Sequence, residues 1–90
     1  MTQNRKILIL KYLTQTLKDV VRYKKCGVVG LPEDVYDFTF NRYIVDEDDI
    51  QDIPIDEVIQ DLESIVNKLQ VDEQYYGVIE DNIPNWVFYN

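Results

Sequence analysis

Two segments place apolar residues at the three- and four-residue spacing of one helical face, and this spacing constrains the fold more than any other feature. The longer stripe occupies segment 55–69 and consists of Ile55, Val58, Ile59, Leu62, Ile65, Val66 and Leu69. Pro54 precedes it and the acids Asp56 and Glu57 follow, a pattern typical of a helix start. Segment 4–25 has the same spacing at Leu10, Leu13, Leu17, Val20 and Val21, with Ile9 and Tyr12 at the edge of the stripe. Both segments are therefore predicted to be amphipathic helices.

Three further runs have the character of β-strands. Aromatic and polar residues alternate within segment 35–45, which is also rich in β-branched side chains. The runs 74–80 and 85–89 are short and apolar, and the turn residues 81–84 separate them. Alternation and short apolar runs next to turn residues are typical of strands.

These elements predict one α+β domain over residues 1–90. In this prediction two amphipathic helices pack on a small antiparallel sheet, in the order α-β-α-β-β. The alternative is an all-α bundle of three to four helices, in which segments 32–45 and 73–80 are short helices.

The side-chain inventory excludes the common catalytic and metal sites. The chain has no histidine and a single cysteine, Cys26, so zinc sites of the Cys/His kind, Cys–His dyads and Ser–His–Asp triads are excluded. An EF-hand loop beginning at Asp46 would need a ligand where Ile50 stands and a glycine where Gln51 stands. The three glycines form no phosphate-binding loop. We therefore expect no enzymatic activity, no cofactor and no metal.

Charge is divided unevenly along the chain. Residues 1–26 contain seven of the nine Lys and Arg residues and one acid, a balance of +6, whereas residues 27–90 contain sixteen acids and two cations, a balance of −14. One interpretation is that the basic segment pairs with the acidic part within the molecule. The other adds that the remaining acidic surface attracts a cationic partner and accelerates its encounter.

Acids and aromatic residues together predict a partner-binding face. Surface carboxylates orient and steer a partner, whereas tyrosine and tryptophan are the side chains that most often anchor an interface. The predicted contact residues are Asp46, Glu47, Asp48, Asp49, Asp52, Asp56, Asp72, Glu73, Tyr75, Tyr76 and Trp86. The alternative for each of them is a solvated loop acid or a core aromatic.

The adjacent pair Tyr75 and Tyr76 depends on the local structure. In a strand the two side chains point to opposite faces, so that one serves the core and the other faces outward. In a short helix they lie about 100° apart and can both border an exposed surface.

The segment around this pair resembles two kinds of toxin-neutralising protein. Asp72-Glu73-Gln74-Tyr75-Tyr76 has the form D-x-x-Y-Y and resembles the acidic tandem-tyrosine segment of colicin-type DNase immunity proteins. Tyr75-Tyr76-Gly77 is similar to the Y-Y-G of the barstar-like ribonuclease inhibitors. Gly77 stands where the colicin immunity pattern has proline, and Val78 where the barstar pattern has an acid. Immunity proteins of contact-dependent growth inhibition share the small size and acidity.

The resemblance implies an inhibitor that occludes the active site of a secreted or injected nuclease, with Asp72, Tyr75 and Tyr76 as contacts. We accordingly predict a stoichiometric bacterial immunity protein or antitoxin that binds a cationic nuclease toxin and is a monomer when free. Two alternatives remain. One is a regulatory subunit that docks through its basic N-terminal helix, and the other is a phage-encoded inhibitor of a host nucleic-acid enzyme.

The expected location is the cytoplasm. The longest aliphatic run, Ile7 to Leu10, is far shorter than a membrane span and is followed by no signal-peptide cleavage site. A lone cysteine suits a reducing compartment. No direct contact with nucleic acid or membrane is expected.

Overall fold

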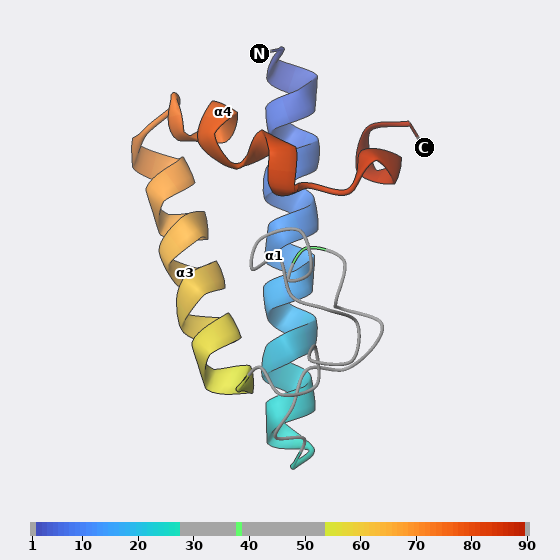
Figure 1. The fold of residues 1–90 in the computed structure, drawn as a ribbon, viewed down its shortest axis with the longest axis vertical. Helices are drawn as coiled ribbons and strands as arrows, with labels where there is room; N and C mark the ends of the chain where they lie inside the picture. Colours follow the sequence, from blue (N-terminus) through green and yellow to red (C-terminus); the bar gives the residue numbers. More distant parts are fainter. Residues whose placement is uncertain (1, 28–37, 39–53, 90) are drawn as a thin grey trace.

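The computed structural model describes residues 2–27, 38 and 54–89, and these residues are helical with short connections (Figure 1). Helix α1 spans Gln3–Lys25, helix α3 spans Ile55–Val71 and the short helix α4 spans Tyr75–Ile79. Two 3₁₀ turns follow, η3 over Glu80–Asn82 and η4 over Asn85–Phe88. The two long helices predicted from the apolar spacing are thus confirmed.

Helices α1 and α3 lie side by side and run in opposite directions, and the C-terminal segment crosses the N-terminal half of α1 (Figure 1). Ion pairs join both ends of this helical hairpin, Lys6 with Glu73 at one end and Lys24 with Asp56 at the other. The core fills the space between these elements. Its members are Ile9, Leu13, Val20, Phe38, Ile55, Val58, Leu62, Ile65, Val66, Leu69, Tyr76, Ile79, Ile83 and Val87.

The buried face of α1 is shifted from the centre of the predicted stripe towards its Ile9 edge. Its fully buried residues are Ile9, Leu13, Thr16 and Val20, whereas Leu10, Leu17 and Val21 are half-buried on the flank. The half-buried residues flank this row because α1 contacts η4 as well as α3. Thr16 fits this face because its hydroxyl donates to the Tyr12 carbonyl oxygen at 2.9 Å.

The prediction of an α+β fold is wrong for the part of the chain that the structure describes. That part is 84% helical and contains no strand or sheet. Its class is that of the helical alternative. Phe38, the single described residue of the predicted strand 35–45, is helical and buried, and the remainder of that strand lies outside the described residues.

The predicted strand 74–80 forms α4 and η3 instead. The Asp72 carboxylate accepts the backbone N–H of Gln74 at 3.1 Å, and the Asp72 carbonyl accepts that of Tyr75 at 3.1 Å. These bonds turn the chain at the end of α3 and begin a new helix. The buried residues Tyr76, Ile79 and Ile83 then recur at three- and four-residue spacing, a helical period that outweighs their β propensity.

The predicted closing strand 85–89 is the 3₁₀ turn η4. A lone strand would leave its backbone donors and acceptors unpaired, because no other described segment is extended beside it. Here the N–H of Val87 donates to the Pro84 carbonyl at 3.1 Å, and that of Tyr89 donates to the Trp86 carbonyl at 3.3 Å. Val87 is the only fully core residue of η4; Phe88 is half-buried against the core, and Asn85 and Trp86 are exposed.

Two glycines are expected to respond in opposite ways to alanine. Gly27 follows the end of α1 with φ of +87°, a left-handed conformation that a Cβ atom disfavours, so Gly27→Ala should lower the free energy of unfolding by about 1–2 kcal/mol. Gly77 lies inside α4, and an added Cβ there meets no atom within 4 Å. Gly77→Ala should therefore raise the free energy of unfolding by about 0.5–1 kcal/mol. Urea denaturation followed by circular dichroism measures both, and shifts of the same sign would contradict the assignment.

In the described part of the chain, no helix combines the length and the apolar character that crossing a membrane requires.

Candidate functional site

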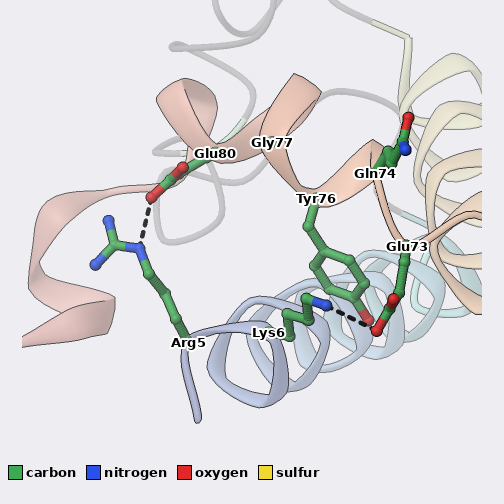
Figure 2. Close-up of a pocket in the computed structure, with 7 residues that line it drawn as sticks. All are labelled: Arg5, Lys6, Glu73, Gln74, Tyr76, Gly77 and Glu80. Atoms are coloured by element: carbon green, nitrogen blue, oxygen red, sulfur yellow. Dashed lines mark hydrogen bonds and ion pairs between the residues drawn. The ribbon is translucent and has the colours of Figure 1, made fainter. Parts of the chain in front are cut away.

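A pocket of about 470 Å³ lies between the first turns of α1 and the segment 73–80, which contains α4 (Figure 2). Both partners of two ion pairs line it, together with residues of the tandem-tyrosine segment. The full lining consists of Arg5, Lys6, Glu73, Gln74, Tyr76, Gly77 and Glu80.

Each cation of the pocket is held by an acid from the C-terminal segment. The Lys6 ammonium lies 2.7 Å from a Glu73 carboxylate oxygen and 5.9 Å from the centre of the Tyr76 ring. Arg5 donates from Nε to Glu80 at 2.5 Å. Figure 2 shows that the two pairs stand on either side of the pocket, with the Tyr76 ring beside Lys6. The pocket is thus lined by two cations and two acids whose charges balance.

The Lys6–Glu73 pair gives the molecule a pH-dependent contact. The hydrogen bond from Lys6, and then its positive charge, hold the pKa of Glu73 below its ordinary value of 4.5. A carboxyl whose pKa is lower in the folded state stabilises the fold above its unfolded pKa, and this contribution is lost as the pH falls through the lower, folded value. When the pH is lowered below about 4.5, the melting temperature of Glu73→Gln should therefore fall less than that of the unmodified protein. Glu63→Gln, which removes an exposed α3 acid that forms no ion pair among the described residues, serves as the control. Equal acid sensitivity of the two variants would show that the contact has no such role.

An exposed aromatic pair lies next to the pocket on η4 and the residue that follows it. Trp86 is 51% exposed, and its ring meets the Tyr12 ring edge-on with the centroids 5.5 Å apart. Tyr89 is 81% exposed. Between them in sequence, Phe88 lies under the Arg5 guanidinium, whose carbon atom is 3.7 Å from the ring centre. We call Trp86 and Tyr89 the aromatic pair. Arg5 connects η4 to the pocket, because it lies over the Phe88 ring and also pairs with Glu80.

The structure brings together some of the sequence-predicted contact residues and separates others. Asp46, Glu47, Asp48, Asp49 and Asp52 lie outside the described residues. Of the remainder, Glu73 and Tyr76 line the pocket and Trp86 belongs to the neighbouring aromatic pair, whereas Asp56 lies at the opposite end of α3.

The tandem tyrosines divide into two different environments. Tyr76 is 7% exposed and is a core residue, whereas Tyr75 is half-buried and packs against the core from its edge. The Asp72 carboxylate interacts with residues near it in the chain. It accepts the backbone N–H of Gln74, and its Oδ2 lies 3.9 Å from the Lys68 ammonium nitrogen. The side chains of this segment that reach solvent most freely are therefore Glu73 and Gln74.

Much of the charge asymmetry is compensated within the molecule. Three of the seven N-terminal cations, Arg5, Lys6 and Lys24, pair with acids of the C-terminal part. This agrees with the intramolecular interpretation of the sequence. Pairing neutralises charges locally but leaves the formal net charge of −8 unchanged, so the field at a distance from the molecule remains negative.

The predicted contact residues do not include four members of this surface, Arg5, Lys6, Glu80 and Tyr89. The Arg5–Glu80 pair joins residues 75 positions apart, and no local pattern signals such a contact. The sequence could have indicated Tyr89 as an exposed aromatic residue, because it follows the last core position, Val87, by two residues.

The geometry of this site suits recognition by contact. Among residues 2–27, 38 and 54–89, no group of three or more His, Cys, Asp or Glu side chains is arranged to hold a metal ion. The pocket provides hydrogen-bond donors and acceptors at fixed positions, and the aromatic pair adds apolar area at its side.

Comparison with known proteins returned no matching family model, curated protein or solved structure.

Proposed function

We propose that the protein is a stoichiometric inhibitor that binds another protein, and specifically an immunity protein that blocks a cationic nuclease toxin. The observation that carries this proposal is the exposed aromatic pair beside a polar, charge-compensated pocket. Exposed aromatic side chains next to fixed polar groups are the usual anchors of protein interfaces.

The net charge of −8 supports a cationic partner. A nuclease active site holds phosphates with lysine and arginine, so a negative protein is attracted to the same groups. This attraction accelerates encounter and orients the two proteins, while the desolvated aromatic contacts provide most of the affinity.

The proposed contact set differs from the predicted one in the tandem tyrosines. Trp86 and Tyr89 act as anchors, and Glu73 provides a carboxylate at the edge of the pocket. Tyr75 is half-buried against the core and is not part of the pocket lining, whereas Tyr76 lines the pocket from the core.

The decisive experiment tests the class of partner. The immobilised protein is used to capture its partner from lysate of the source cells, and the captured protein is assayed for nuclease activity. We expect nuclease activity that one molar equivalent of this protein abolishes. Captured proteins without nuclease activity, or activity that persists in excess inhibitor, would overturn the proposal.

The anchors are tested with matched single substitutions against the captured partner. Trp86→Ala and Tyr89→Ala should each weaken binding by about tenfold or more, the size expected of interface anchors. Val71→Ala is the control, since Val71 is 84% exposed but lies at the C-terminal end of α3, on the other side of α1 from η4 (Figure 1). Equal effects of all three substitutions would remove the aromatic pair from the interface.

The electrostatic part of the proposal has its own readout. Raising the salt concentration from about 50 mM to about 500 mM should lower the association rate strongly while changing the dissociation rate little. An association rate that is insensitive to salt would leave the aromatic anchors in place but remove steering by charge.

A further inference from the structure

A second concave surface lies along α1 and α3, away from the pocket. It has a volume of about 460 Å³ and is lined by Leu17, Lys18, Val21, Arg22, Lys25 and Glu63. We call it the basic groove. All but Glu63 belong to the C-terminal half of α1.

Among the described residues, the cations of the groove have no ionic partner, unlike those of the pocket. Lys18, Arg22 and Lys25 are exposed and form no ion pair among the described residues, whereas Arg5, Lys6 and Lys24 are all paired. In a protein of net charge −8, three neighbouring unpaired cations form a local positive site.

The positions of these cations follow the helix. Lys18, Arg22 and Lys25 are spaced i, i+4 and i+7, so they form one row about 10 Å long on the surface of α1. Leu17 and Val21, one turn apart and half-buried, provide an apolar strip beside the row. The groove therefore offers an apolar strip with cations along one side.

We infer that the basic groove is a docking site for an acidic amphipathic helix of a partner protein. Such a helix presents apolar side chains on one face, which would cover Leu17 and Val21. Carboxylates at i, i+4 and i+7 on its flank would match the row of cations. Recognition of an apolar stripe with flanking charge is the usual mode by which a helix enters a groove.

Charge favours a peptide over nucleic acid as the occupant. Phosphate binding gains its strength from many cations along a continuous path, and here only three cations line the groove, with Glu63 among them. The net charge of −8 repels a polyanion as a whole. A short acidic helix carries fewer charges and gains the apolar contact as well.

The site is independent of the proposed inhibitor surface. The basic groove uses the C-terminal half of α1, whereas the pocket uses its first turns and the aromatic pair lies on η4 and at Tyr89. A protein with both surfaces could hold its cationic target on one and an acidic segment on the other. Failure of either proposal leaves the other standing.

The test is a titration of the full chain, labelled with ¹⁵N, with a synthetic amphipathic helical peptide that bears leucines on one face and glutamates at i, i+4 and i+7 on the flank. We expect the amide signals of residues 17–25 and those around Glu63 to shift. A peptide of the same composition in scrambled order, which lacks the amphipathic face, should bind about tenfold more weakly. A single-stranded oligonucleotide should not compete.

Charge reversal locates the contact. Arg22→Glu combined with Lys25→Glu should reduce affinity for the peptide by about tenfold or more, because two charge-assisted contacts become repulsive. Lys11→Glu is the matched control, being an exposed cation of the same helix that lies outside the groove. Since all three side chains are exposed, these variants should remain folded, and circular dichroism verifies this.

Four results would overturn the inference. They are the absence of binding up to about 1 mM peptide, equal affinity for the scrambled peptide, equal loss of affinity in Lys11→Glu, and displacement of the peptide by the oligonucleotide.

Discussion

A Leu13→Ala substitution should lower the free energy of unfolding by about 2–5 kcal/mol. Leu13 is 0% exposed at the centre of α1, where the helix meets the rest of the core. Its replacement removes apolar contacts and leaves a cavity that the packed surroundings fill only in part. The total stability of a domain of this size is about 5–13 kcal/mol, so this loss is a substantial fraction of it.

The control for Leu13→Ala is Ile7→Ala on the same helix. Ile7 is 53% exposed, and its substitution should change the free energy of unfolding by less than about 1 kcal/mol. Urea denaturation, monitored by the circular dichroism signal of the helices, gives both values. Equal losses in the two variants would mean that α1 does not pack as described.

Tyr76→Ala should lower the free energy of unfolding by about 3–5 kcal/mol, as for other buried aromatic residues. Tyr76 is 7% exposed and packs in the core, and its ring also lies under the Lys6 ammonium beside the Lys6–Glu73 pair. The substitution therefore removes core volume and the support of the pocket together. Tyr75→Ala, at a half-buried position, should cost about 1–2 kcal/mol.

A conservative substitution separates the packing of Tyr76 from a role in partner binding. Tyr76→Phe retains the ring, so it should retain stability within about 1 kcal/mol and leave partner affinity unchanged. Urea denaturation and binding measurements on the same samples test both statements. A stable Tyr76→Phe protein that has lost affinity for its partner would show that the Tyr76 hydroxyl contacts the partner, contrary to this assignment.

The long helices were predictable because their signal is local and repeated. In α3 all seven predicted apolar positions are buried or half-buried, and the helix begins at Ile55, directly after Pro54. Proline before the first turn, followed by acids, specifies the start without reference to the rest of the molecule.

The C-terminal third was predicted incorrectly because its local signals conflict. Tyr75, Tyr76, Val78 and Ile79 each favour a strand, yet the buried positions 76, 79 and 83 follow at spacings of three and four residues. A strand needs a partner strand to pair its backbone, whereas a helix pairs its own, and only the arrangement of the surrounding elements decides between them.

The sequence predicted part of the candidate site, the tandem-tyrosine segment, but not the residues that lie opposite this segment across the pocket. The tandem-tyrosine segment does line the pocket, but the other wall consists of Arg5 and Lys6, almost the full length of the chain away. The predicted role of Asp56 in partner binding remains untested, and its carboxylate pairs with Lys24 at the other end of the hairpin.

By itself the sequence determined the two long helices, the division of charge and the absence of histidine, since each depends on residue identity and short-range spacing. The tertiary structure decided which cations are neutralised, which tyrosine is buried and where aromatic side chains reach solvent. These properties depend on packing between segments distant in the chain. Tyr76 enters the core where α4 packs against α3. The cations of the basic groove have no ionic partner among the described residues, whereas Glu73 and Glu80 pair with Lys6 and Arg5 at the other end of that helix.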